Sequence, residues 1–385
     1  MSQVLVDVDQ LPAMDVAGRA ARLRPLLANA GCDALLVTKL VNIRYLTGFT
    51  GSAGLLLVDA DGLVLLTDGR YEEQATEELA RAGVDATLRI VLSLAGQFEV
   101  IASATSGRRL GLEAHAVSWA QHREMVETYL PSVGQLVPTH GLVEGLRIVK
   151  DDGEVARIEA AATIASAALA SVSPVLFDRP TENDVGLALD SEIRRLGAAG
   201  NSFETIVGSG PNGAKPHHRA AGSRRTVDTG DLVVFDFGAT VDGYCSDMTR
   251  TACIGEPTDT QRRMLDVVTE AQASGVALVA AGAETTAVDA ACRDVIASAG
   301  WRDAFSHGTG HGVGLEIHED PRVSWSAAAT LAAGHVVTVE PGVYLPEHGG
   351  VRIEDTVVVT AKGCRSLTHF TKEPDPHAWP SPPTT

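Results

Sequence analysis

The sequence predicts two domains, an α/β domain followed by an α+β domain. The chain has 385 residues, which is long for a single hydrophobic core. Up to about residue 145, short apolar runs alternate with helical patterns, as in α/β domains. Beyond that point, long helices and short strands come in separate runs, which indicates a curved antiparallel sheet. We therefore expect domains over 1–145 and 146–373, and a tail over 374–385.

The first domain begins with a predicted helix over Asp15–Ala30, which ends before Gly31, a residue that commonly terminates helices. A buried strand, Ala34–Val37, follows. Two apolar runs then flank Asp59–Gly62, whose composition predicts a hairpin. These two strands and the remaining elements, a helix, a strand and a second helix, are Leu55–Val58, Leu63–Leu66, Tyr71–Ala82, Ala86–Val91 and Val117–Tyr129.

The second domain begins with an alanine-rich helix over Asp152–Val172 that carries an apolar stripe. The next helix, Thr181–Leu196, starts with a capping box in which Asp184 replaces the usual Glu or Gln. Further helices and the short strands are predicted at Thr260–Ala280, Thr286–Ala299, Thr205–Val207, Leu232–Phe237, Val336–Val339 and Val351–Val359. The tail is rich in Pro and polar residues, and we expect it to be flexible.

Composition excludes several classes of function. The chain has 49 acidic and 31 basic residues, a net charge of −18, which disfavours binding to nucleic acid or to an anionic membrane. Its 5 cysteines are widely spaced and include no CxxC pair, so we expect a reducing cytoplasm rather than disulfides or a thiolate zinc site. Residues 1–24 carry acids before any apolar run, unlike a signal peptide. No apolar run approaches the roughly 18 residues that span a bilayer, so we expect a soluble protein.

Carboxylates occur where the sequence otherwise predicts buried strands. Asp236 lies within an apolar strand, Glu340 ends another, and Glu354 precedes a third. An unpaired ionised carboxylate in such surroundings costs several kcal/mol, so each should be neutralised by a partner or a metal. Taken singly, each is also compatible with a solvent-facing or arginine-paired side chain. Arg352, for example, lies on the same strand face as Glu354.

The spacing of these acids is more informative than any one of them. Asp247 follows Asp236 by 11 residues and Glu354 follows Glu340 by 14, spacings that hairpins would bring side by side. A glycine-rich stretch with two histidines, His307–Gly314, lies between the pairs. Four carboxylates and one imidazole suit Mn²⁺, Co²⁺ or Zn²⁺, and two such cations would balance the charge and acidify a shared water. The pattern predicts a two-metal hydrolase of peptides or of phosphate esters.

The complete motif set resembles a known family. It consists of Asp236–Gly238, Cys245–Arg250, Gly310–Glu319, Glu340–Gly342 and Val351–Asp355. It resembles the pita-bread metallopeptidases, and within them the Xaa-Pro branch of prolidase and aminopeptidase P, of which the segment Asn42–Phe49 is also typical. The resemblance covers almost the whole chain. It implies a creatinase-like N-terminal domain, a pita-bread catalytic domain, two divalent ions (Mn, with Co or Zn as alternatives) and a homodimer.

The resemblance also implies roles for individual residues. The metal ligands would be Asp236, Asp247, His311, Glu340 and Glu354, with Asp247 and Glu354 bridging. Glu340 would also move a proton as a general base, and His318 would stabilise the tetrahedral intermediate. His217 matches a substrate-binding histidine, although a shift of one residue would give this role to His218.

Two further residues have alternative interpretations. His307 would line the pocket or only bond a loop carbonyl. Arg352 would contact the substrate or form a salt bridge to Glu354 or Asp355.

The activity that the resemblance implies is hydrolysis of the Xaa-Pro bond in short peptides. No cluster in the N-terminal domain could obviously bind a substrate carboxylate, so the sequence favours an aminopeptidase, with a dipeptidase as the alternative. The segment Asn42–Gly54 of a partner subunit is our candidate for the pocket wall. A non-enzymatic binding module on this fold and a two-metal phosphoesterase are the rival interpretations.

Overall fold

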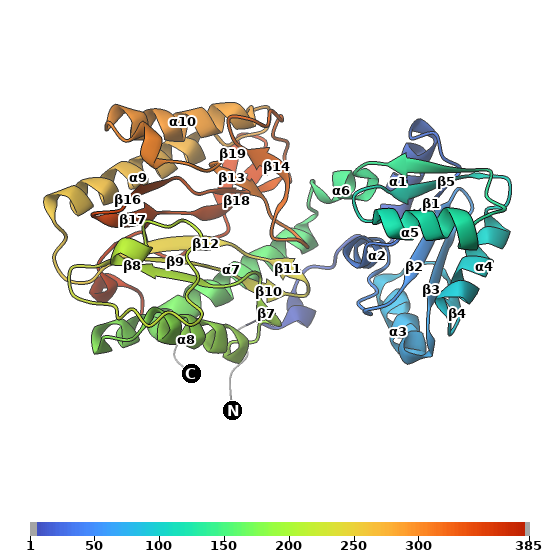
Figure 1. The fold of residues 1–385 in the computed structure, drawn as a ribbon, viewed down its shortest axis with the longest axis horizontal. Helices are drawn as coiled ribbons and strands as arrows, with labels where there is room; N and C mark the ends of the chain where they lie inside the picture. Colours follow the sequence, from blue (N-terminus) through green and yellow to red (C-terminus); the bar gives the residue numbers. More distant parts are fainter. Residues whose placement is uncertain (1–5, 382–385) are drawn as a thin grey trace. The chain divides into compact units, whose positions relative to one another are not determined.

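The computed structural model describes residues 6–381, which form two compact units (Figure 1). One unit is Met14–Arg147. The other comprises residues 148–381 together with residues 6–13. The predicted first domain was therefore wrong for residues 6–13, because Val8 and Leu11 pack against the core of the C-terminal unit. These residues are too short a segment to carry a periodic signal of their own.

The N-terminal unit is an α/β domain, as predicted, around a 6-stranded sheet with the order β4-β3-β2-β1-β5-β6. Its strands are β1 Ala34–Val37, β2 Leu55–Asp59, β3 Leu63–Thr67, β4 Thr87–Ile90, β5 Arg109–Glu113 and β6 Gln135–Thr139. β1, β2 and β3 pair antiparallel, and the outer pairs are parallel. The helices are α1 Arg19–Asn29, α2 Leu40–Thr47, α3 Glu72–Ala82, α4 Leu94–Ala104, α5 Trp119–Glu124 and α6 Leu142–Arg147. The sequence missed α2, α4, α6, β5 and β6.

Helix α2 owes its start to a residue far along the chain. The backbone N–H groups of Thr38 and Lys39 donate to Oε2 of Glu113, which lies at the end of β5, at 2.6 and 2.9 Å. This carboxylate takes the place of a local capping side chain at the helix N-terminus. A local pattern therefore gave no start signal for this short helix.

The C-terminal unit contains the helices α7 Asp152–Val172, α8 Glu182–Arg195, α9 Asp259–Leu278 and α10 Thr285–Ser298. Figure 1 shows the strands of this unit between two pairs of helices, α7 with α8 on one side and α9 with α10 on the other. The predicted capping box at the start of α8 is present, since Thr181 and Asp184 bond each other's backbone N–H. This arrangement is the pita-bread fold that the motifs implied.

Helix α7 and the short helical segment after it are unusually apolar. By length and composition Asp152–Asp178 could cross a membrane, because an 18-residue window has a mean hydropathy of 1.7. The expectation that no apolar run approaches this length was therefore wrong. However, 61% of the window is buried inside the protein, and Ala161, Ala165 and Ala168 are completely buried in the core. We interpret α7 as the central helix of a core.

The strands of the C-terminal unit form small antiparallel sheets. Their orders are β12-β9-β8, β14-β13-β15-β18-β19, β11-β10-β7 and β16-β17. The strands are β7 Gly200–Asn201, β8 Ile206–Ser209, β9 Leu232–Phe237, β10 Ala239–Val241, β11 Tyr244–Cys245, β12 Met248–Cys253, β13 Gly310–Gly312, β14 Glu319–Val323, β15 Val336–Val339, β16 Gly342–Leu345, β17 Gly349–Arg352, β18 Asp355–Thr360 and β19 Gly363–Ser366. The predicted strand Val351–Val359 is broken at Ile353 and Glu354, where the chain passes from one sheet to another.

The C-terminal segment is packed and not free. Trp379 is 7% exposed and contacts the rings of Phe235 and Phe370 in the core. The carbonyl of Pro374 accepts a hydrogen bond from the N–H of Cys253. The prediction of a flexible tail is therefore wrong for residues 374–381, because one buried indole outweighs a composition typical of tails. Residues 382–385 lie outside the described part of the chain.

Candidate active site

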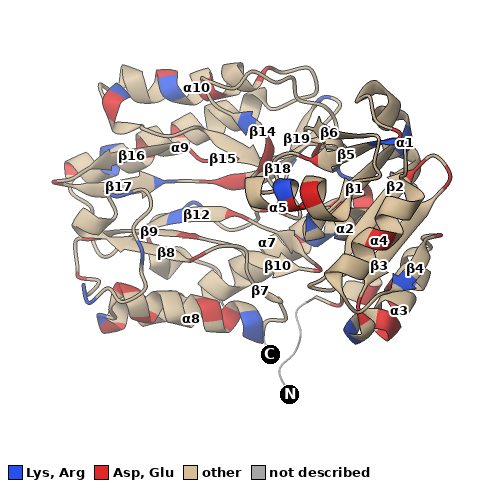
Figure 2. Ribbon diagram, turned by 45° about the vertical axis from the view of Figure 1, so that its right-hand side comes forward, with Lys and Arg blue, Asp and Glu red and all other residues tan. Residues whose placement is uncertain are grey.

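The predicted carboxylate pairs are brought together by strand pairing. β9 and β12 pair antiparallel with Asp236 opposite Thr249, so Asp247 lies at the near end of the same pair. β16 and β17 form a hairpin with Gly342 opposite Arg352, so Glu340 and Glu354 flank it. Figure 2 shows the basic and acidic residues where β17 ends and β18 begins. The two spacings noted in the sequence thus correspond to two hairpin-like pairings.

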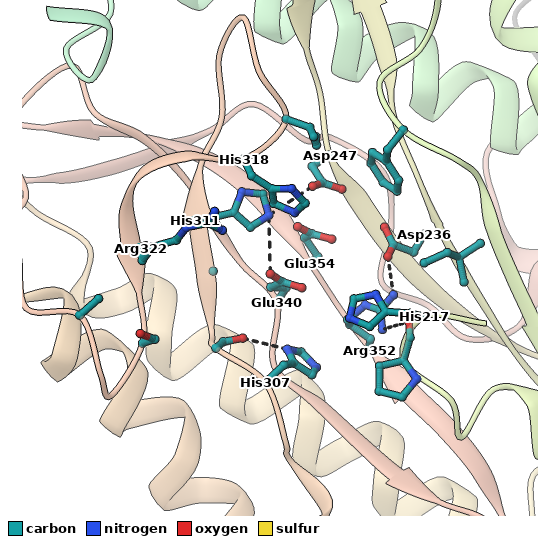
Figure 3. Close-up of a pocket in the computed structure, with 18 of the residues that line it drawn as sticks. His217, Asp236, Asp247, His307, His311, His318, Arg322, Glu340, Arg352 and Glu354 are labelled. Carbon is teal, nitrogen blue, oxygen red and sulfur yellow. Dashed lines mark hydrogen bonds and ion pairs between the residues drawn. The ribbon is translucent and has the colours of Figure 1, made fainter. Parts of the chain in front are cut away.

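At the centre lies a compact group of potential metal ligands (Figure 3). One ligand atom from each of Asp247, His311 and Glu354 lies within 4.8 Å of the others, and all three residues are buried. His311 Nε2 is 3.5 Å from Asp247 Oδ2 and 3.7 Å from Glu340 Oε1. The structure therefore brings together four of the five residues that the motifs imply as ligands, with Asp236 beside them.

The hydrogen bonds of His311 determine which nitrogen faces this group. Nδ1 lies 3.0 Å from the carbonyl oxygen of Gly312, which can only accept, so Nδ1 carries the proton. Burial lowers the pKa of His311 to about 3, so the ring is neutral near pH 7. Nε2 therefore presents a lone pair to carboxylate oxygens. Lone pairs facing one another across 3.5 Å are repulsive unless a proton or a metal cation lies between them, and in metal sites a backbone carbonyl commonly orients the histidine in this way.

Two carboxylate oxygens of the group have no partner. Among the described residues, Asp247 Oδ1 and Glu354 Oε1 are buried without a hydrogen bond. Burial and the negative charges of Glu354, Asp236 and Glu340 raise the pKa of Asp247 well above its ordinary value. Burial and the charges of Glu340 and Asp236 likewise raise the pKa of Glu354. Burial also raises the pKa of Glu340 to about 8. Orphaned buried oxygens and crowded acids fit a site for divalent cations.

Arg352 forms neither of the two salt bridges that the sequence suggested. Its guanidinium pairs with Asp236, not with Glu354 or Asp355, and donates to the hydroxyl of Tyr344 at 2.8 Å. Asp355 instead pairs with Arg250 at 2.8 Å and with another cation of the C-terminal segment. The sequence-based salt bridges were wrong because they considered neighbours along one strand, whereas Asp236 comes from β9. Arg352 lines the pocket, as the substrate-contact interpretation requires.

The carboxylates form one wall of a cavity of about 440 Å³. His217, His307 and His318 also line it, whereas His218 does not. The two ring nitrogens of His307 bond the carbonyl of Gly308 and the hydroxyl of Tyr344, both at 2.8 Å, so both interpretations of His307 hold. Burial lowers the pKa of His307 to about 3 and also lowers that of His318. Both rings are therefore neutral near pH 7.

Sequence reasoning missed several residues of the site. Thr249 donates its hydroxyl proton to Glu354 Oε2 at 2.7 Å and accepts from Arg352 Nε at 3.1 Å, so it fixes which oxygen of Glu354 stays free. Its place directly inside the Cys245–Arg250 motif was the available signal. Arg322 and Trp325 line the cavity, and no local pattern singled them out.

Asn42, the first residue of the segment proposed as a pocket wall, has a structural role instead. It is completely buried within the N-terminal unit. It donates to Glu113 and Glu144 at 2.7 and 2.8 Å and accepts from Arg147 at 2.7 Å. Asn42 is therefore structural and unavailable to a bound peptide, whereas Thr50 and Ser52 of the predicted wall segment are exposed.

Comparison with known proteins gives a consistent result along most of the chain. Residues 19–149 match the creatinase/prolidase N-terminal domain, and residues 156–361 match metallopeptidase family M24. The peptidase YqhT of Bacillus subtilis is 40% identical over 358 residues, covering 91% of this chain and 98% of the relative. The Xaa-Pro dipeptidase from Bacillus anthracis superposes with a TM-score of 0.86 at 36% identity, covering 94% and 99% of the two chains. The X-Pro aminopeptidase from Thermotoga maritima superposes with a TM-score of 0.83 at 33% identity, covering 92% and 99%.

Proposed function

The chain belongs to metallopeptidase family M24, and we propose that it hydrolyses the Xaa-Pro bond of short peptides with two divalent metal ions. The observation that carries this proposal is the pair of orphaned oxygens, Asp247 Oδ1 and Glu354 Oε1, buried beside the free lone pair of His311. The substrate class is supported by the similar proteins from B. anthracis and T. maritima, which are named for Xaa-Pro and X-Pro peptide bonds. Membership of a peptidase family disfavours the phosphoesterase and binding-module interpretations.

The residues that would hold the ions are Asp236, Asp247, His311, Glu340 and Glu354. Four oxygen donors and one imidazole nitrogen suit Mn²⁺, with Co²⁺ or Zn²⁺ as alternatives. When bound, such ions act as Lewis acids that polarise the scissile carbonyl and make a water more acidic. Asp247 and Glu354 would each offer the ions an oxygen that has no other partner among the described residues.

Glu340 and His318 can carry the proton transfer and the charge. The Glu340 carboxylate, which bound cations would keep ionised, can accept a proton from the attacking water and pass it to the leaving proline nitrogen. His318 is neutral, and its ring lies 4.4 Å from that of His311 between centroids. A ring N–H of His318 can therefore donate to the oxyanion that forms when water attacks the carbonyl.

The pocket offers a physical reason for proline selectivity. Proline has no amide N–H after the scissile bond, so it needs no acceptor there. Both nitrogens of His307 are already engaged, and the Tyr344 hydroxyl is shared between His307 and Arg352. The faces of the His307 ring, together with Phe203 and Ile206, remain as an apolar part of the cavity lining. The N–H of an ordinary residue would have no partner beside these groups.

The length of the substrate is the finer question, and Arg322 favours a dipeptide. Within the described residues, this guanidinium has no hydrogen bond or ion pair, yet it lines the cavity, and its charge acts on Glu340 and His318. A free α-carboxylate of a dipeptide would supply the missing partner. The sequence-based preference for an aminopeptidase considered only the N-terminal domain, whereas this cation comes from β14. An aminopeptidase remains the alternative.

Peptides that differ only at the C-terminus test both levels of the proposal. With Mn²⁺ present, Ala-Pro should be cleaved and Ala-Ala should not, and EDTA should abolish turnover. Arg322→Gln should raise KM for Ala-Pro about 10-fold or more but leave cleavage of Ala-Pro-amide unchanged, because only the carboxylate pairs with the guanidinium. Arg302→Gln, an exposed arginine outside the cavity, is the matched control.

The outcomes separate the two levels. Absence of Xaa-Pro cleavage in the metal-loaded enzyme would refute the peptidase proposal. Equal effects of Arg322→Gln on the acid and the amide, or faster cleavage of Gly-Pro-Leu than of Ala-Pro, would favour the aminopeptidase.

We also propose a homodimer and a cytoplasmic location, on the grounds given by the sequence. Light scattering and cell fractionation measure these two properties.

A further inference from the structure

His217 is placed in the pocket by its backbone alone. His217 is an exposed residue, and within residues 6–381 no hydrogen bond or ion pair holds its ring. It lies on the segment between β8 and β9, which has only one short helical turn, Gly210–Asn212. An unrestrained ring on such a segment would sample many positions, whereas a group that contacts substrate must be held closely in place. Something other than the ring itself must fix it.

The next residue, His218, points the other way and is firmly bound. Its Nε2 lies 2.8 Å from Oε2 of Glu182, a residue in the first turn of α8 whose side chain has no exposed surface. Figure 3 shows His217 facing Asp236 and Arg352 in the cavity. Consecutive side chains of this turn therefore have separate tasks. One faces the cavity, and the other is anchored to the scaffold.

Glu182 is a rigid anchor because several donors share it. Its carboxylate accepts from the backbone N–H and the hydroxyl of Ser209 at 2.7 and 2.8 Å, from the side-chain amide of Asn212, and from the hydroxyl of Ser223. Ser209 precedes the turn and Ser223 follows it. Burial raises the pKa of Glu182, but these hydrogen bonds outweigh it, so the pKa lies below its ordinary value and the group is ionised at pH 7.

The backbone around His217, residues 216–218, is held by two further hydrogen bonds. The carbonyl of Pro216 accepts from the guanidinium of Arg352 at 3.3 Å, and the backbone N–H of His218 donates to the carbonyl of Lys215 at 3.0 Å. The backbone of His217 is thus fixed by a contact on each neighbouring residue. Arg352 belongs to the candidate active site, whereas Glu182 lies outside it. The hydrogen bond between Glu182 and His218 is therefore a separate restraint on the backbone of His217.

We propose that Glu182 and His218 are positioning residues that hold the His217 ring at the substrate. This proposal rests on the proposed function only in assuming that His217 contacts a peptide substrate. The physical reason is the steep dependence of catalysis on placement, since a shift of about 1 Å can cost about 10²-fold. His218→Ala should therefore lower kcat/KM for an Xaa-Pro peptide about 10- to 100-fold. His218→Gln should restore most of this loss, because its amide N–H can replace Nε2–H.

A double-mutant cycle separates positioning from a general structural effect. If His218 acts through His217, the double variant His217→Ala/His218→Ala should have the kcat/KM of His217→Ala within about 2-fold. Independent, additive losses would overturn the proposal, as would wild-type kcat/KM in His218→Ala. The matched control is His369→Ala, which removes another histidine–glutamate contact, to Glu159 at 3.1 Å, outside the cavity, and should leave kcat/KM unchanged.

A measurement without turnover distinguishes this proposal from the proposed function. Hydrogen–deuterium exchange of peptides covering residues 210–223 should rise in His218→Ala, return to wild-type rates in His218→Gln, and stay at wild-type rates in His217→Ala. Unchanged exchange in His218→Ala would overturn the positioning role even if the enzyme cleaves Xaa-Pro peptides. Raised exchange in a protein that cleaves none would leave the anchor intact and refute only the peptidase proposal.

Discussion

Removing divalent cations with a chelator should leave a folded protein in which the Glu340 carboxyl contributes less stability as the pH rises. Burial raises the pKa of Glu340 from 4.5 to about 8, and it also raises those of Asp247 and Glu354. Between these two values the Glu340 carboxyl holds a proton in the folded, metal-free protein but not in the unfolded chain. The contribution of Glu340 to the free energy of unfolding therefore decreases with pH across that range, and it is complete only below pH 4.5. The buried His307, His311 and His318, whose pKa values are lowered, act in the opposite direction below pH 6.5.

The magnitude follows from the shift. About 3.5 units at about 1.36 kcal/mol each give about 5 kcal/mol for Glu340, and solvent screening of its side chain, which is 18% exposed, makes this an upper limit. Between pH 5.5 and 7.5 the loss is up to about 2.7 kcal/mol, or about 5 to 10 °C in Tm for a unit of this size. Bound cations should remove this loss, since they replace the protons.

The assay is differential scanning calorimetry of metal-free and Mn²⁺-loaded protein from pH 5.5 to 7.5. Glu340→Gln, which cannot ionise, should flatten the fall in Tm of the metal-free protein. Glu256→Gln, at a side chain that is 96% exposed, is the control and should not. A Tm that falls more steeply with pH in metal-free Glu340→Gln than in the metal-free wild type would refute the reasoning. An equal slope in wild type and Glu340→Gln would do the same.

Three further predictions concern the metal and the packing. Asp247→Ala and Glu354→Ala should each lower the bound Mn²⁺ from about two ions per chain, measured by mass spectrometry of the metal, and abolish peptide hydrolysis. Thr249→Val should weaken Mn²⁺ binding about 10- to 100-fold in calorimetry, and Thr249→Ser should not, because only the hydroxyl orients Glu354. Trp379→Ala should cost about 3 to 5 kcal/mol in denaturant unfolding, whereas Trp119→Ala, at 77% exposure, should change stability by less than about 0.5 kcal/mol. Equal effects of the two tryptophan substitutions would contradict the packing of the C-terminal segment.

Local pattern was sufficient for most of the helices, but it missed many of the short strands of the C-terminal unit. The hairpin around Asp59–Gly62 and the capping box of α8 were predictable because each depends on residues a few positions apart. Helix α2 was not, since its N-terminus is satisfied by Glu113 from β5. The burial of Trp379 was missed for the same reason: its partners, Phe235 among them, lie far away in the sequence.

The sequence by itself determined that Asp236, Asp247, Glu340 and Glu354 form one set, because an acid inside an apolar strand needs a counter-charge and hairpin spacing shows which acids meet. Only the tertiary structure decided where individual side chains point. It paired Arg352 with Asp236, and it turned His217 into the cavity and His218 towards Glu182. Within residues 6–381 it left Arg322 without a hydrogen bond or ion pair. Periodicity assigns a residue to a face of its own element, whereas its partner depends on which other element the fold packs against that face.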